Sequence, residues 1–328
     1  MSRILVFGSG SVGTMYAMLL SRAGADIACV CRSNYEPALS RGFTVHSTLF
    51  GNQTFKPRVA KSVQEAVDNQ ASSVPFDFIV VCVKAVDTGV SPAEMIKPAV
   101  RESHTSIVVI QNGLGVEAIY HQAFPRNTVI SGVTYMPTSQ VEPCVVSHSE
   151  TQTLFLGPYP TELTTPADKS STEAFSQLIV AAGANATVCD DIQVERWKKL
   201  IGNTTWNPVC ALSRCRDLQF LHATPDIAQG FITESMREVV AVASTLGYGD
   251  VIREDAVQAQ IQRSKTRQWP GVQPSMLADI ENDRPVEVEA VIGEVVRIAR
   301  KHQVSVPRLE TLYVLLKGYD YHLRAKQI

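Results

Sequence analysis

The sequence predicts an α/β domain with a doubly wound parallel sheet, followed by an all-helical domain. In the first half, apolar segments of strand length alternate with helical segments, as in a parallel sheet covered on both faces. Beyond residue 190, helical periodicity dominates and strand candidates are few. The 328 residues fit two domains, which we place at residues 1–189 and 190–328.

The strands and helices of the first half follow from its apolar segments, of which residues 79–83 and 107–110 are the most apolar. Residues 141–157 alternate polar and apolar residues and indicate antiparallel additions at the sheet edge, whereas the Pro-, Thr- and Ser-rich residues 157–171 indicate a surface loop. The expected strands are 3–8, 25–31, 77–83, 106–110, 128–133 and 184–189. The expected helices are 13–23, 63–68, 116–123 and 172–182.

The second half is expected to be helical throughout. Pro208 lacks a backbone N–H, so the first helix should kink or end near it. Apolar residues of the last helix indicate core in preference to a subunit interface, which leaves a homodimer open; they are Leu309, Leu312, Val314 and Leu315. The expected helices are 192–206, 226–246, 253–263, 275–282, 286–301 and 307–323.

Composition and charge exclude several classes of protein. The net charge of −2 argues against a nucleic-acid partner, and no apolar run approaches the length of a membrane span. The N-terminus does not have the pattern of a signal peptide. The seven cysteines are scattered, which indicates free thiols in a reducing compartment and a cytoplasmic protein. The histidines show no metal-ligand spacing, so no metal site is expected.

The segment Gly8-Ser9-Gly10-Ser11-Val12-Gly13 has the pattern G-x-G-x-x-G. It lies between an expected strand and an expected helix, which is the context of a Rossmann-type dinucleotide site. The first glycine permits the tight turn, the second lets a pyrophosphate approach, and the third lets helix and strand pack closely. The unpaired N–H groups at the start of the helix then face the phosphate. A glycine-rich turn without a ligand is the less favoured interpretation.

The end of the second strand indicates the cofactor. Asp26 lies at the beginning of this strand, where it cannot bind the ribose 2′-hydroxyl of NAD. Arg32 at the end can pair with a 2′-phosphate, and Ser33 and Asn34 can donate hydrogen bonds. We therefore expect NADP(H) in preference to NAD(H), unless Arg32 is an ordinary surface arginine.

A stripe of polar residues opens the helical half. Lys199, Asn203 and Asn207 have the spacing i, i+4, i+8, which places one ammonium and two amides on one helix face. Asparagine is a modest helix former, so two on one face indicate a role in binding a small polar substrate. A solvated polar face is the alternative.

These segments and two others together resemble the ketopantoate reductases (2-dehydropantoate 2-reductases). The match covers nearly the whole chain. It consists of Gly8–Gly13, Gln111-Asn112-Gly113-Leu114-Gly115, Lys199…Asn203…Asn207-Pro208, and Ser275-Met276-Leu277…Asp279…Arg284…Glu287.

The resemblance implies a Rossmann domain, a helical domain and an active site between them. It implies that Lys199 is the catalytic general acid and that Glu287 supports it and holds the substrate. It further implies substrate-binding and cofactor-side residues, which are Asn203, Asn207, Ser275, Asn112 and Lys84. Simpler roles exist for several of them: Glu287 can complement a helix N-terminus, Ser275 can cap a helix, and Asn112 can form a turn.

The expected function is NADPH-dependent reduction of a small-molecule 2-oxo acid. The leading substrate is 2-dehydropantoate, reduced to (R)-pantoate in pantothenate biosynthesis. A different branched or aromatic 2-oxo acid is an alternative, because Trp206 and Trp269 can line a pocket or simply pack. A non-catalytic NADP(H) sensor is a third, disfavoured by Lys199 and Glu287. Residues 46–58 and 139–171 are expected to form long loops of unassigned role.

Overall fold

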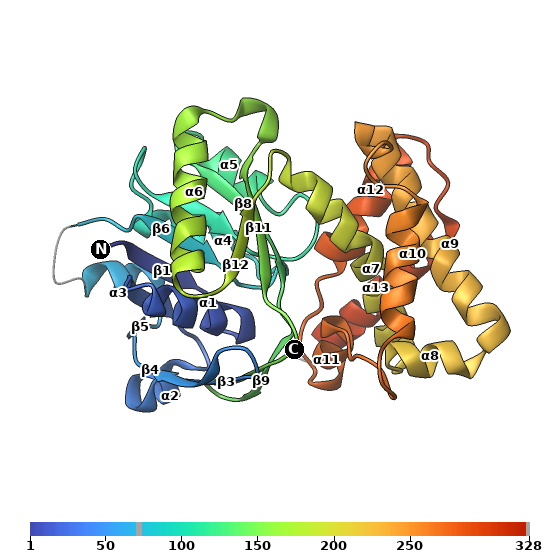
Figure 1. The fold of residues 1–328 in the computed structure, drawn as a ribbon, viewed down its shortest axis with the longest axis horizontal. Coiled ribbons are helices and arrows are strands. Elements are labelled where there is room, and N and C mark those ends of the chain that lie inside the picture. Colours follow the sequence, from blue (N-terminus) through green and yellow to red (C-terminus); the bar gives the residue numbers. More distant parts are fainter. Residues whose placement is uncertain (70–73, 326–328) are drawn as a thin grey trace. The chain divides into compact units, whose positions relative to one another are not determined.

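The computed structural model describes residues 1–69 and 74–325 and divides into two compact units (Figure 1). The first unit consists of Met1–Gln111 and Val116–Ile192, and the second consists of Asn112–Gly115 and Gln193–Ile328. The first contains every strand of the described residues, and the second is helical, as the sequence predicted. Four residues from the first half of the sequence, Asn112–Gly115, therefore belong to the helical unit.

An eight-stranded sheet forms the centre of the first unit, in the order β12-β11-β8-β7-β6-β1-β2-β5. Every neighbouring pair is parallel except β8 and β11, so the expected antiparallel addition is present. The residues of β1, β6 and β7 are buried throughout, which explains their continuous apolar sequences. The strands are β1 (Arg3–Phe7), β2 (Asp26–Val30), β5 (Arg58–Ala60), β6 (Phe78–Val81), β7 (Ser106–Val109), β8 (Val129–Tyr135), β11 (Thr153–Tyr159) and β12 (Asn185–Val188).

Helices cover this sheet, and α1 and α6 pack against each other (Figure 1). Helix α6 begins six residues earlier than the expected residue 172, at Pro166. The reason is a capping box, in which Thr165 accepts from the backbone of Asp168 and the Asp168 carboxylate accepts from the backbone of Thr165. The prediction of a loop to residue 171 was therefore wrong. The helices are α1 (Ser11–Arg22), α2 (Tyr35–Arg41), α3 (Val63–Asp68), α4 (Pro92–Ile96), α5 (Ala118–Ala123) and α6 (Pro166–Ala181), with short 3₁₀ turns at Lys97–Ala99 and Thr161–Leu163.

A second, four-stranded sheet occupies segments expected to be loops. Strands β3 (Phe43–Ser47) and β4 (Gly51–Phe55) form one hairpin, and β9 (Thr138–Glu142) and β10 (Val145–His148) form another. Strand β3 pairs with β10 in parallel, so the two hairpins make one sheet that packs against α1. The prediction of long loops at 46–58 and 139–171 was wrong in both places.

The second unit consists of helices (Figure 1). Its core is formed by buried apolar side chains. Helix α7 continues past Pro208 to Ser213, so the expected end near this proline was wrong. In the last helix Leu309 and Leu312 are buried as expected, but Val314 and Leu315 are exposed. No helix of the described residues is long and apolar enough to cross a membrane. The helices are α7 (Ile192–Ser213), α8 (Asp217–Ala223), α9 (Pro225–Ala243), α10 (Glu254–Lys265), α11 (Ser275–Glu281), α12 (Glu294–Lys301) and α13 (Pro307–Ala325), with π-helical turns η3 (Ser244–Tyr248) and η4 (Glu289–Gly293).

Candidate functional site

The glycine-rich segment forms a tight turn from the end of β1 into α1. Gly8 has φ +102°, and a Cβ there would lie 2.6 Å from the backbone nitrogen of Val83. A Cβ on Gly13 would overlap the carbonyl of Gly8. In contrast, a Cβ on Gly10 would meet no described atom within 4 Å. Two glycines are thus required by packing inside the unit, whereas the third leaves open space where a pyrophosphate can approach the backbone.

The start of α1 supplies donors for that space. The first backbone hydrogen bond of the helix runs from Thr14 N to Gly10 O at 2.9 Å. The N–H groups of Ser11, Val12 and Gly13 precede it and have no acceptor within the helix, which makes them an anion site. The Ser9 hydroxyl donates to Val30 O at 3.0 Å, so this side chain fixes the turn to β2. The described residues therefore fit a dinucleotide phosphate.

The residues that follow β2 differ in their exposure to solvent. Arg32 and Ser33 are exposed, and within residues 1–69 and 74–325 the structure records no ion pair for Arg32. Asn34 is buried, and its Nδ2 donates to Ser9 O and to Gln140 Oε1, each at 2.8 Å. The expectation that Asn34 offers a hydrogen bond to the cofactor was therefore wrong, because both hydrogens are used inside the unit. Asp26 lies at the start of the strand, where it pairs with Arg58 at 2.7 Å.

Lys84 follows β6, the strand that neighbours β1 in the sheet. It is partly buried, and it lies at the carboxyl edge of the sheet, where the glycine-rich turn also lies. This is the edge at which doubly wound sheets bind ligands. Lys84 is thus placed on the side of the sheet that its expected role requires.

The polar stripe of α7 is completed by the short segment Asn112–Gly115. Lys199 Nζ donates to Asn112 Oδ1 at 2.7 Å. The segment is held in place on both sides, because Arg196 donates to Gly113 O at 2.8 Å and Leu114 N donates to Ala290 O at 2.9 Å. Gly113 has φ +104°, and a Cβ there would overlap Ala290, so only glycine permits this close approach.

The surroundings of Lys199 favour its neutral form more than water does. Burial lowers the pKa of Lys199 to about 7, and the guanidinium of Arg196 acts in the same direction. The carboxylate of Glu287 opposes both effects and raises the pKa. An amine with a pKa near neutrality can both donate and recover a proton at physiological pH, which is the property a general acid needs.

Asn207 and Ser275 come together from different helices. Asn207 Oδ1 lies 3.3 Å from the Ser275 hydroxyl, which donates to it, and it also accepts from Met276 N at 3.3 Å. Asn207 thereby caps the start of α11. Asn203, one turn earlier on α7, is partly buried, and the structure records no hydrogen bond for its side chain among the described residues. Its amide is therefore available to a ligand.

Glu287 is nearly buried and lies just before the π-helical turn η4. The chain between Ser275 and Glu287 is folded by an ion pair, in which Arg284 Nε contacts Asp279 Oδ1 at 3.1 Å. Arg284 N also donates to Asp279 O at 2.9 Å. Asp279 and Arg284 thus stabilise the turn between α11 and Glu287.

Comparison with known proteins identifies the family. The family model described as Ketopantoate reductase PanE/ApbA matches residues 4–161, and its C-terminal counterpart matches residues 191–320. The chain belongs to the ketopantoate reductase family. It is therefore an oxidoreductase of the nicotinamide-dependent class that acts on CH–OH groups.

Individual relatives of this family match along the whole chain. A 2-dehydropantoate 2-reductase of Nostoc sp. is 26% identical over 98% of this chain and 97% of its own. The crystal structure of 2-dehydropantoate 2-reductase from Methylococcus capsulatus is 30% identical, with a TM-score of 0.83 over 98% of this chain and 97% of that one. A D-mandelate dehydrogenase solved with NADH and anilino(oxo)acetate has a TM-score of 0.82 over 98% and 99% of the two chains, but at 18% identity it shares the fold alone.

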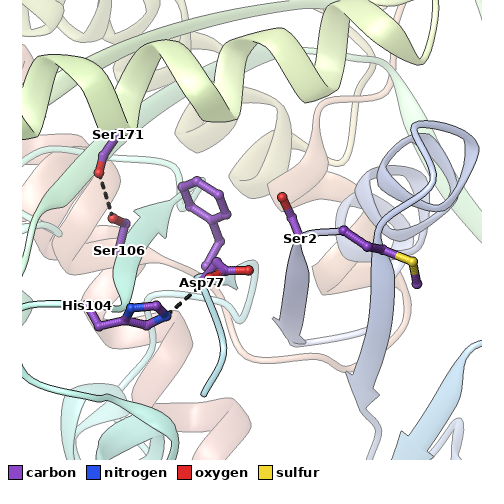
Figure 2. Close-up of a pocket in the computed structure, with 7 residues that line it drawn as sticks. Ser2, Asp77, His104, Ser106 and Ser171 are labelled. Atoms are coloured by element: carbon purple, nitrogen blue, oxygen red, sulfur yellow. Dashed lines mark hydrogen bonds and ion pairs between the residues drawn. The ribbon is translucent and has the colours of Figure 1, made fainter. Parts of the chain in front are cut away.

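One cavity lies in the first unit (Figure 2). It has a volume of about 360 Å³ and is lined by residues at the amino ends of β1, β6 and β7. His104 Nε2 contacts Asp77 Oδ1 at 3.1 Å, and the Ser106 hydroxyl donates to Ser171 at 3.2 Å. Because cofactors bind at the carboxyl ends of parallel strands, this cavity is not the dinucleotide site.

The two tryptophans that were considered as pocket walls have other surroundings. Trp206 is buried in the apolar core of the helical unit, which favours packing. Trp269 is 63% exposed, and its ring lies 5.2 Å from that of His222. Neither environment indicates a particular substrate.

Arg196 is a residue that sequence reasoning missed. It is 3% exposed, which is unusual for arginine, and it contacts the segment that carries Asn112. The available signal was its position one helical turn before Lys199, on the same face of α7.

Proposed function

We propose that this protein reduces a 2-oxo acid with NADPH, and that the substrate is 2-dehydropantoate, which becomes (R)-pantoate in pantothenate biosynthesis. The observation that carries the proposal is the Lys199–Asn112 hydrogen bond of 2.7 Å, made by a lysine whose pKa is lowered to about 7. A structural lysine on a solvated helix face has no such partner and no such shift. Relatives named 2-dehydropantoate 2-reductase, which match over nearly the whole chain, support the choice of substrate.

Reduction of a ketone requires a proton for the oxygen as well as a hydride for the carbon. A dinucleotide held by its pyrophosphate at the glycine-rich turn would supply the hydride from its nicotinamide. The ammonium of Lys199 stabilises the negative charge that develops on the oxygen and then donates its proton. Asn112 holds the Nζ in place, and Glu287 favours the protonated form before the reaction.

The remaining residues of the second unit bind and orient the acid. The side-chain amide of Asn203 offers donors and an acceptor one turn from Lys199. Asn207 and Ser275, already joined to each other, provide polar groups at the start of α11. Together they would hold the carboxylate and hydroxyl groups of the substrate, while Gly8–Gly13, Lys84 and Asn112 would contact the cofactor.

The preference for NADPH rests on Arg32. Its side chain is exposed at the end of β2, and no carboxylate follows this strand in the position that binds the 2′-hydroxyl of NAD. An arginine pairs strongly with a phosphate, through two parallel hydrogen bonds in the best geometry. Arg32→Ala should therefore weaken NADPH binding much more than NADH binding.

The test follows the absorbance of NADPH with purified protein and a panel of 2-oxo acids, with NADH in parallel. The panel contains 2-dehydropantoate and branched and aromatic 2-oxo acids, the last because a D-mandelate dehydrogenase shares this fold. Oxidation that is fastest with NADPH and 2-dehydropantoate supports the proposal. Faster turnover of another member of the panel reassigns the substrate, and binding of NADPH without turnover of any acid refutes the catalytic role.

A further inference from the structure

Two hydrogen-bonded amides, one buried (Asn34) and one partly buried (Gln140), link the loop after β2 to the second sheet. Asn34 Nδ2 donates to Gln140 Oε1 at 2.8 Å, and Gln140 Nε2 donates back to Asn34 Oδ1 at 3.3 Å. Asn34 lies in the loop that follows β2, and Gln140 lies on β9, 106 residues later. The two side chains therefore join parts of the first unit that the chain order keeps far apart.

The same asparagine also fixes the glycine-rich turn. Its Nδ2 makes a second hydrogen bond, to Ser9 O at 2.8 Å, so both hydrogens of this nitrogen are used. Asn34 is 6% exposed. Because a buried amide without a partner lowers the stability of the fold, the side chain is held in the orientation that keeps its hydrogen bonds. The pair thus connects three elements: the phosphate turn, the end of β2 and the second sheet.

Two further contacts attach the same region to the β9–β10 hairpin. The thiol of Cys144 lies 3.3 Å from Asn34 O, and Arg41 at the end of α2 donates to Pro143 O at 2.8 Å. The second sheet itself packs on α1, the helix that the phosphate turn begins. The sheet is therefore fixed to the phosphate turn and to α2, the two elements that flank the end of β2.

The exposed residues of this region lie between β2 and Asn34. Arg32 and Ser33 lie between the last residue of β2 and Asn34, and neither is buried. The flexible guanidinium of an arginine binds a phosphate more tightly when its backbone is already ordered, because less conformational entropy is lost on binding. Fixing Asn34 fixes one end of this short loop.

We propose that Asn34 and Gln140 are positioning residues that hold the Arg32–Ser33 loop for the 2′-phosphate, so that the second sheet contributes to the selection of NADPH over NADH. The inference rests on the proposed preference for NADPH. The pair acts through Arg32 and does not itself contact the cofactor. The chemical group that it selects is a phosphomonoester on the ribose.

The test measures the dissociation constants of NADPH and NADH by fluorescence titration, so it requires no substrate. Gln140→Leu removes the amide and keeps a similar volume. Gln53→Leu is the matched control, because Gln53 is also partly buried in the second sheet and its side chain donates to Phe50 O, in the turn between β3 and β4. Circular dichroism and thermal unfolding confirm that both variants are folded.

Loss of the two hydrogen bonds should raise the dissociation constant of NADPH about tenfold in Gln140→Leu, which corresponds to about 1.4 kcal/mol of binding free energy. The dissociation constant of NADH should change less than about threefold. Both dissociation constants of Gln53→Leu should equal those of the unmodified protein. In an Asn34→Ala background, Gln140→Leu should have no further effect on the NADPH to NADH ratio.

Three results would overturn the inference. Equal weakening of NADPH and NADH by Gln140→Leu would mean that the pair supports the phosphate turn and not the 2′-phosphate. No weakening of either, with Arg32→Ala still selective against NADPH, would refute the pair while the proposed cofactor stands. If Arg32→Ala weakens both cofactors equally, the proposed NADPH preference itself fails, and the inference fails with it.

Discussion

The titration of Lys199 makes a quantitative prediction about the pH dependence of catalysis. In the proposed mechanism the proton donor is the ammonium form of Lys199, so activity should be highest below its pKa and should fall as the pH rises through that value. With a pKa of about 7, about half of the lysine is protonated at pH 7 and about one hundredth at pH 9. We expect kcat/KM for the 2-oxo acid, at saturating NADPH, to fall about fiftyfold between pH 7 and pH 9. A lysine with the usual pKa of about 10.4 would leave this range flat.

The assay is the initial rate of NADPH oxidation in buffers of constant ionic strength from pH 6 to pH 10. Lys199→Ala should lower turnover by about 10²- to 10⁴-fold and should abolish the descending limb. Lys198→Ala is the matched control, because Lys198 is adjacent in the sequence but its ammonium pairs with Glu195 at 2.7 Å. A flat profile to pH 9, or a descending limb that survives in Lys199→Ala, would refute the assignment of Lys199 as the acid.

Three further predictions follow from the same cluster. Glu287→Gln removes the carboxylate that raises the pKa of Lys199, so the midpoint of the pH profile should move below that of the unmodified protein; an unchanged or higher midpoint would contradict the contact. Arg196→Met should move the midpoint upward, because the guanidinium lowers the pKa, and should also reduce kcat through loss of the anchor on Gly113; a normal kcat would show that the anchor is dispensable. Gly113→Ala should lower the free energy of unfolding by roughly 2–4 kcal/mol in urea titrations, because φ is positive there and a Cβ would overlap Ala290 of η4. Gly230→Ala is the control: a Cβ at this position of α9 would meet open space, so the free energy of unfolding should rise by up to ~1 kcal/mol.

The parts of the fold that the sequence predicted are those with a local cause. Strands β1, β6 and β7 are buried on both faces, so their apolar sequences identify them without knowledge of their partners. The glycine-rich turn is local in part, since Gly13 is required by the carbonyl of Gly8, whereas Gly8 is required by the backbone of Val83, which follows β6.

The second sheet could not be predicted because its cause is not local. Strand β4, with the sequence Gly-Asn-Gln-Thr-Phe, is largely exposed and lacks the apolar alternation of a half-buried strand. Strand β10 forms a ladder with β3, so Val146 lies opposite Val45, a partner distant in the chain. Short strands of this kind gain their stability from the partner strand and from α1, which no local pattern reveals.

The candidate site shows the same division. The spacing of Lys199, Asn203 and Asn207 is a property of one helix and is visible in the sequence. The role of Asn34 depends on Gln140, and the fold of the segment from Ser275 to Glu287 depends on an ion pair within it. Such pairings are decided by tertiary structure, so residue type alone assigned Asn34 to the wrong task.

The segment that follows β7 passes from the first unit to the second between residues 111 and 112. Gln111 belongs to the first unit, where its Nε2 donates to Val83 O at 2.9 Å and its Oε1 accepts from Tyr120 at 2.9 Å. The next residue, Asn112, belongs to the second unit and accepts from Lys199. Val83 is also the residue whose backbone a Cβ on Gly8 would meet, so Gln111 is fixed to the chain that closes the glycine-rich turn. Adjacent positions in the sequence thus serve different units: the amide of Gln111 fixes the chain beside the glycine-rich turn, whereas the amide of Asn112 binds Lys199.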